Sequence, residues 1–191
     1  IALNVKGLPY ESVPKHLLRD GGEQRKADYL ALNPQGLVPA LGHDGAFISQ
    51  SLAICEYLEE IQPEPPLLPG SALDRAKIRA MALAVACAVH PLQYLRREFG
   101  QDDDGVNRWA RHWISSGFAA LEQWIEVNSA DGRYCYGSSV TLADVFLLPQ
   151  VFNARRVETD LGPYPRIVAV AEHLLSLPAF AAARPEAQPD A

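Results

Sequence analysis

The sequence predicts a chain in two parts, a small α/β unit followed by an all-α unit. Two short apolar runs at 37–41 and 46–49 flank the turn-forming pair Asp44-Gly45, a pattern typical of a β-hairpin. Residues 62–70 contain four prolines, which indicates a linker. Beyond it, apolar residues recur at helical spacing. The expected boundaries are 1–62 for the α/β unit, 63–70 for the linker and 71–191 for the helical unit.

The first unit is expected to have the element order β-α-β-β-α. The first of these strands is expected to be missing from the sequence. Residues 1–7 read as the end of a helix, because Lys6 suits a helix C-terminus and Gly7 the position after it. We therefore expect the sequence to begin inside its first helix. The other expected elements are an edge strand at 10–17 containing Pro14, a short helix at 26–32, and a helix from Ser51 whose inner face carries Leu52, Cys55, Leu58 and Ile61.

Two dipeptides near the hairpin indicate a candidate binding site. Val38-Pro39 stands at the entrance of the first strand, where a proline removes a backbone donor and can hold a cis bond. Gln50-Ser51 stands at the start of the next helix, which Ser51 is predicted to cap. Free N–H groups at a helix N-terminus favour an anion. The pattern therefore predicts a carboxylate site beside an open strand edge.

The second unit is expected to be entirely helical. Apolar residues at spacings of three and four form a stripe within 109–127, which predicts a core helix. Trp113 and Trp124 lie beside this stripe and are also expected in the core. Thr141 and Asp144 form a capping-box pattern with Asp in place of Glu. The remaining expected helices are 74–89 and 165–177.

Composition narrows the classes of partner. The 191 residues include 17 basic and 23 acidic ones, a net charge of −6, and no cluster of Lys and Arg. We therefore expect no nucleic-acid or membrane partner. The longest apolar run, 80–89, is about half of a membrane span. Three widely separated cysteines, Cys55, Cys87 and Cys135, predict buried thiols in a reduced cytoplasmic compartment, and no His/Cys spacing indicates a metal site.

Eight phrases of the sequence carry a resemblance to a known family, at 1–4, 30–41, 50–54, 90–93, 141–144, 148–151, 163–165 and 188–190. Together they resemble the zeta class of the cytosolic glutathione transferases, which includes maleylacetoacetate isomerases and the related maleylpyruvate isomerases. The resemblance covers nearly the whole chain, in family order. It implies a thioredoxin-like N-terminal domain, a helical C-terminal domain, glutathione as cofactor and a homodimer.

The resemblance assigns the glutathione contacts to the first unit. The cysteinyl backbone of glutathione would pair with the main chain of Val38, next to a cis-Pro39. Its γ-glutamyl carboxylate would meet the Ser51 hydroxyl and the helix N-terminus, with an amide contact from Gln50. Gln35 would approach the glycyl end, or would be a solvated loop residue.

The implied reaction is cis–trans isomerisation of maleylacetoacetate to fumarylacetoacetate, a step of aromatic amino-acid catabolism. A glutathione thiolate adds to the double bond of this dicarboxylate, the resulting single bond rotates, and elimination releases the trans isomer. Arg156, which follows Asn153-Ala154, would bind a substrate carboxylate. His90 would contact substrate or glutathione, or would be a structural residue at a helix end, and Arg155 is expected at the surface.

The sequence departs from the zeta-class pattern in two places. The serine-containing motif that activates the thiol is expected upstream of Ile1, so the catalytic residue is unknown. After Gln93 the family usually has several more residues before a Tyr-Leu-like segment. The alternatives are a maleylpyruvate isomerase, a general glutathione transferase, or a non-catalytic glutathione-fold module for binding or dimerisation.

Overall fold

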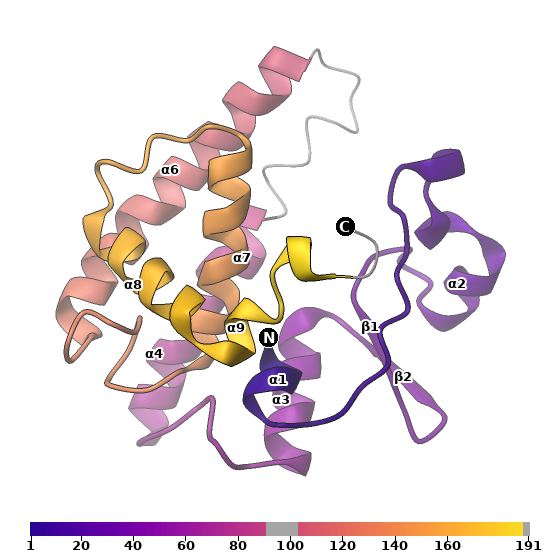
Figure 1. The fold of residues 1–191 in the computed structure, drawn as a ribbon, viewed down its shortest axis with the longest axis horizontal. Coiled ribbons are helices and arrows are strands. Elements are labelled where there is room, and N and C mark those ends of the chain that lie inside the picture. Colours follow the sequence, from indigo (N-terminus) through magenta and orange to yellow (C-terminus); the bar gives the residue numbers. More distant parts are fainter. Residues whose placement is uncertain (91–102, 189–191) are drawn as a thin grey trace.

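The computed structural model describes residues 1–90 and 103–188 and shows one two-stranded sheet beside a group of helices (Figure 1). Three short 3₁₀ turns and a π-helical segment, Ala84–Val89, complete the described elements. The α-helices and strands are α1 (Ala2–Val5), α2 (Ala27–Leu32), β1 (Ala40–His43), β2 (Ala46–Ser49), α3 (Ser51–Ile61), α4 (Ala72–Leu83), α6 (Asp103–Asn128), α7 (Leu142–Arg156), α8 (Pro165–Ser176) and α9 (Pro178–Ala181).

The predicted hairpin is confirmed. β1 and β2 pair antiparallel, with Ala40 opposite Ser49 and His43 opposite Ala46. The turn residues Asp44 and Gly45 have φ angles of 49° and 77°, as a type I′ turn requires. Helix α3 follows β2 directly and packs against the hairpin and α1.

The edge strand expected at 10–17 is absent, and that prediction was wrong. Pro9 and Pro14 lack N–H donors, and the two described strands pair with each other and not with this segment. The side chains of Tyr10 and Val13 are 48% and 65% exposed, so the segment also buries little apolar surface. The order in the described chain is therefore α-α-β-β-α.

Helix α6 supplies much of the core of the helical part. Its predicted stripe is confirmed, because each of its four members is at most 2% exposed: Ile114, Phe118, Leu121 and Ile125. The helix begins earlier than expected, at Asp103. Trp124 is 38% exposed, so its assignment to the core was wrong.

The helix expected at 74–89 divides in two. Ser71 and Asp74 form a capping box at the start of α4, and the helix changes at Ala84 to a π-helix that ends at Val89. Gly117 of α6 lies against this π-helical segment, where a Cβ would be 2.1 Å from Val89 Cγ2. Because Val89 is completely buried, only glycine fits at this crossing.

The capping box of α7 is confirmed. The Asp144 carboxylate accepts bonds from the Thr141 amide at 2.7 Å, from the Thr141 hydroxyl at 2.8 Å, and from the Cys135 amide at 2.7 Å. Thr141 and Asp144 are fully buried. The box therefore ties the loop before α7 to the first turn of that helix.

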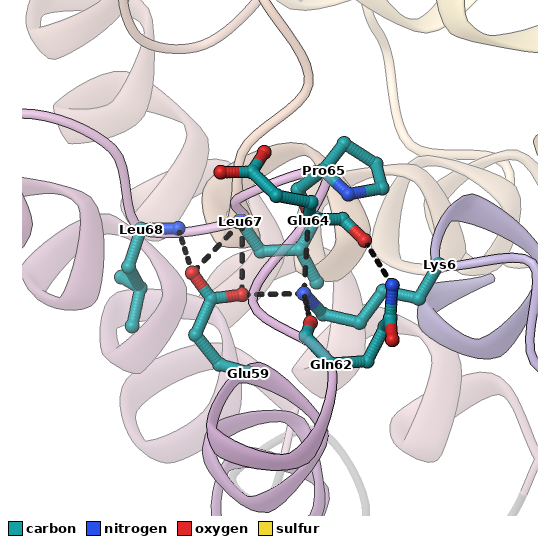
Figure 2. A network of polar contacts seen from close by, with 7 residues as sticks. All are labelled: Lys6, Glu59, Gln62, Glu64, Pro65, Leu67 and Leu68. Atoms are coloured by element: carbon teal, nitrogen blue, oxygen red, sulfur yellow. Dashed lines mark hydrogen bonds and ion pairs between the residues drawn. The ribbon is translucent and has the colours of Figure 1, made fainter.

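A buried ion pair joins three segments that are distant in the sequence (Figure 2). Lys6 Nζ lies 2.7 Å from Glu59 Oε2 and donates to the carbonyls of Gln62 and Pro65 at 2.6 and 3.1 Å. The Glu59 carboxylate also accepts the amides of Leu67 and Leu68. These contacts hold the end of α1, the end of α3 and the linker together.

All three cysteines are free. Cys55 and Cys135 are buried, which raises the pKa of both thiols, to about 11 for Cys55. Cys87 is exposed, so the expectation that it is buried was wrong. Across residues 1–90 and 103–188, no helix combines the length and the hydropathy that crossing a bilayer requires.

Candidate functional site

The loop before β1 is held from its inner side. The Leu37 carbonyl accepts hydrogen bonds from Tyr29 Oη and from Asn33 Nδ2, each at 2.7 Å. Tyr29 and Asn33 are 5% and 2% exposed. The Val38-Pro39 bond is cis, and Val38 is 44% exposed. Within the described chain no group hydrogen-bonds the Val38 main chain, so its N–H and C=O are available to a ligand.

Gln50 occupies the N-cap position of α3 in an unusual conformation. Its φ and ψ are 71° and 116°, in the region that favours glycine. The first helical residue is Ser51, and no side chain caps the helix, so the prediction that Ser51 is the N-cap was wrong. The uncapped amides of the first turn and the hydroxyl of the half-buried Ser51 therefore place several hydrogen-bond donors at one point.

The structure brings Gln35 and Gln50 together. Gln50 Nε2 donates to Gln35 Oε1 at 2.7 Å, and both side chains are exposed. Asn33 also supports the loop that contains Gln35, because its Oδ1 accepts a hydrogen bond of 3.2 Å from the main-chain N–H of Gln35. The sequence-predicted glutathione residues thus lie along one continuous segment and at the start of the following helix.

His90 and Arg156, the two predicted substrate residues, are also close to each other. His90 directly follows the π-helical segment and hydrogen-bonds the side chain of Gln150, which is 1% exposed. Arg156 is held by Asn153, whose Oδ1 accepts from Nε at 3.1 Å and from Nη2 at 2.7 Å. The last turns of α7 therefore orient both residues.

Two supporting residues of this second cluster were missed from the sequence. Gln150, Asn153 and Arg156 are spaced three apart, which places them along one face of α7. Asn153 is 7% exposed. Polar residues at helical spacing before the predicted substrate arginine could have indicated both of them. Tyr29 and Asn33 had no comparable signal, because their shared partner is a backbone carbonyl.

We expect His90 to be neutral at pH 7. Partial burial of the ring lowers the pKa of His90, the hydrogen bond to Gln150 opposes this effect, and the positive charge of Arg156 lowers the pKa further. Replacing Arg156 with glutamine removes that repulsion and should raise the pKa of His90. An NMR titration of the imidazole in both proteins measures this shift, and an unchanged pKa would show that the two side chains are not coupled.

Comparisons with known proteins agree with this geometry. The profile of the glutathione S-transferase N-terminal domain matches residues 1–66. A maleylacetoacetate isomerase of Pseudomonas aeruginosa is 47% identical over 196 aligned residues, covering 100% of this chain and 91% of the relative. A holo structure of a maleylpyruvate isomerase, described as a bacterial zeta-class glutathione S-transferase, aligns with a TM-score of 0.93 at 47% identity, covering 100% and 92%.

A second solved structure shows ligands in a similar protein. The maleylacetoacetate isomerase of Methylobacterium extorquens, with bound malonate and glutathione, aligns with a TM-score of 0.91 at 38% identity, covering 100% of this chain and 91% of that one. The fold is therefore that of the glutathione transferases. Within them, this chain belongs to the zeta-class family of maleylacetoacetate and maleylpyruvate isomerases.

Proposed function

We propose that this protein is a glutathione-dependent isomerase that converts maleylacetoacetate to fumarylacetoacetate. The observation that carries the proposal is the open main chain of Val38 beside the uncapped N-terminus of α3, in a chain 47% identical to a maleylacetoacetate isomerase. Maleylpyruvate is the second candidate substrate, because the maleylpyruvate isomerase structure aligns with a TM-score of 0.93.

The residues present fit glutathione. A peptide backbone can pair with the free N–H and C=O of Val38 in the manner of an added strand. A carboxylate can be bound by the Ser51 hydroxyl and by the first amides of α3, whose dipole favours negative charge. The Gln35–Gln50 pair adds amide groups beside that carboxylate. We propose these residues, with Pro39 shaping the edge, as the glutathione site.

When bound, glutathione supplies the thiolate that adds reversibly to the double bond and so permits its rotation. The chain's own residues bind and orient the substrate. The Arg156 guanidinium, held by Asn153, presents N–H donors to a carboxylate. The neutral His90 ring, held by Gln150, adds a hydrogen-bonding group without a second charge. Substrate charge is therefore matched by Arg156, and not by the imidazole.

The direct test is an absorbance assay with the purified protein. Adding enzyme and catalytic glutathione should abolish the maleyl absorbance of maleylacetoacetate, maleylacetone or maleylpyruvate. Relative kcat/KM values for the substrates then decide between the two isomerase assignments. If none of the substrates shows a glutathione-dependent change, the isomerase proposal fails and the non-catalytic binding module becomes the better description.

Replacing Arg156 with glutamine should lower kcat/KM for these substrates by roughly tenfold or more, because a charge-assisted hydrogen bond to the carboxylate is lost. Steady-state kinetics at saturating glutathione measure the effect. The matched control is Arg133→Gln, which removes an exposed arginine that pairs with Asp131. Equal kcat/KM in the wild type and the Arg156 variant would remove this residue from the substrate site.

We also propose a homodimer in the cytoplasm, acting on a small dicarboxylate. The family relationship and the free cysteines support this proposal. The division into a glutathione-binding domain at 1–62, a linker at 63–70 and a helical domain at 71–191 is proposed on the profile match to residues 1–66. The expected gap after Gln93 lies outside the described residues.

A further inference from the structure

A cavity of about 860 Å³ lies at the C-terminal end of α7. Phe152, Arg155 and Arg156 of α7 line one side, Leu175 of α8 contributes to the wall, and Arg184 and Glu186 come from the segment after α9. Figure 1 shows this last segment, in yellow, turning back from α9. The cavity therefore joins the predicted substrate arginine to a part of the chain that the sequence had not linked to the site.

The charge of this cavity is opposite to that of the protein. Three arginines face a single glutamate in a chain whose net charge is −6. Arg79, Arg133 and Arg166 each pair with a carboxylate. In contrast, neither Arg155 nor Arg184 forms an ion pair with any group of residues 1–90 and 103–188. Their charges remain available to an anion.

The Arg184 side chain is held without being neutralised. Its Nη2 donates to the uncharged Leu175 carbonyl at 3.3 Å, an exposed hydrogen bond that leaves the guanidinium its full positive charge. Apolar surface lies beside it, since Phe152 is 42% exposed. A cavity with unneutralised cations and an apolar wall suits an organic anion with a carbon skeleton better than a small inorganic ion.

Arg156 connects this cavity to the cluster of His90 and Gln150. Its charge acts on the His90 ring, and its side chain also lines the cavity. We propose that Arg184, assisted by Arg155, binds the substrate carboxylate that is remote from the double bond. Through this contact, Arg184 determines the preference of the enzyme for dicarboxylates. This inference rests on the proposed isomerase function and specifies the substrate class of its site.

The test compares two substrates that differ at the remote end. Maleylacetoacetate carries a carboxylate there, and maleylacetone carries a methyl group. Replacing Arg184 with glutamine should raise KM for maleylacetoacetate by roughly five- to tenfold and leave KM for maleylacetone and for glutathione unchanged. Arg184→Lys, which keeps the charge, should recover most of the affinity. Glu186→Gln should change KM for maleylacetoacetate in the opposite direction, because it removes a repelling carboxylate.

The outcomes separate this inference from the proposed function. If the wild type isomerises neither substrate, the isomerase function itself fails. If the wild type isomerises both and Arg184→Gln weakens both equally, the residue has a structural role and the inference is overturned. Unchanged kinetics for both substrates overturn it as well. A selective loss with maleylacetoacetate, absent in the Arg133→Gln control, supports it.

Discussion

Replacing Lys6 with methionine is expected to lower the free energy of unfolding by about 3–5 kcal/mol, the usual cost of leaving one member of a buried ion pair unpaired. The Lys6 side chain is completely buried and that of Glu59 is 15% exposed. The change removes the partner of the Glu59 carboxylate and also the donor to the Gln62 and Pro65 carbonyls. Urea unfolding of the variant and the wild type measures the difference.

The control for this variant is Arg133→Met, which breaks an exposed pair with Asp131 and should cost about 1 kcal/mol or less. Adding Glu59→Gln to Lys6→Met should cost less than the sum of the two single changes, because the isolated charge is then gone. A Lys6→Met protein as stable as the Arg133→Met control would refute the importance of the pair.

Replacing Gly117 with alanine is expected to destabilise the protein by about 1–3 kcal/mol through overpacking, despite the better helix propensity of alanine. The new Cβ would lie 2.1 Å from Val89 Cγ2, and a valine in a helix has one preferred rotamer, so its side chain cannot turn away freely. Since Val89 immediately precedes His90, the displacement should also reach the site. Thermal unfolding and the NMR titration of His90 measure both effects.

Val89→Ala in the same chain should restore the position of His90 in the Gly117→Ala protein, because it removes the clashing methyl group. Ser116→Ala, an exposed change one residue away on α6, serves as the control and should leave both measurements unchanged. If Gly117→Ala alone leaves stability and the His90 signal as in the wild type, the close crossing of α6 with the π-helical segment does not constrain the site.

The elements that were predicted correctly have local causes. Asp44-Gly45 specifies its turn by backbone conformation, and the stripe of α6 shows its buried face directly in the sequence. Thr141 and Asp144 form a capping box within four residues. In each case the interacting groups lie near one another in the chain, so their spacing contained the information.

The errors and omissions have non-local causes. The segment at 10–17 has strand-like composition but no partner strand in the described chain, and a strand depends on its neighbour. The uncapped start of α3 depends on the φ angle of Gln50, which residue type does not reveal. Arg184 reaches the end of α7 only because the chain folds back after α9, and no periodicity predicts that return.

The Lys6–Glu59 pair also has a consequence for where the chain can be cut. A fragment that ends at the last residue of α3 would retain both charged side chains but lose the Pro65 carbonyl that Lys6 binds and the Leu67 and Leu68 amides that Glu59 binds. It would also expose the apolar surface that Leu67 and Leu68 cover, both being at most 5% exposed. The shortest N-terminal fragment that keeps these contacts therefore extends beyond Leu68. Composition alone would have identified this segment as a linker that such a fragment could omit.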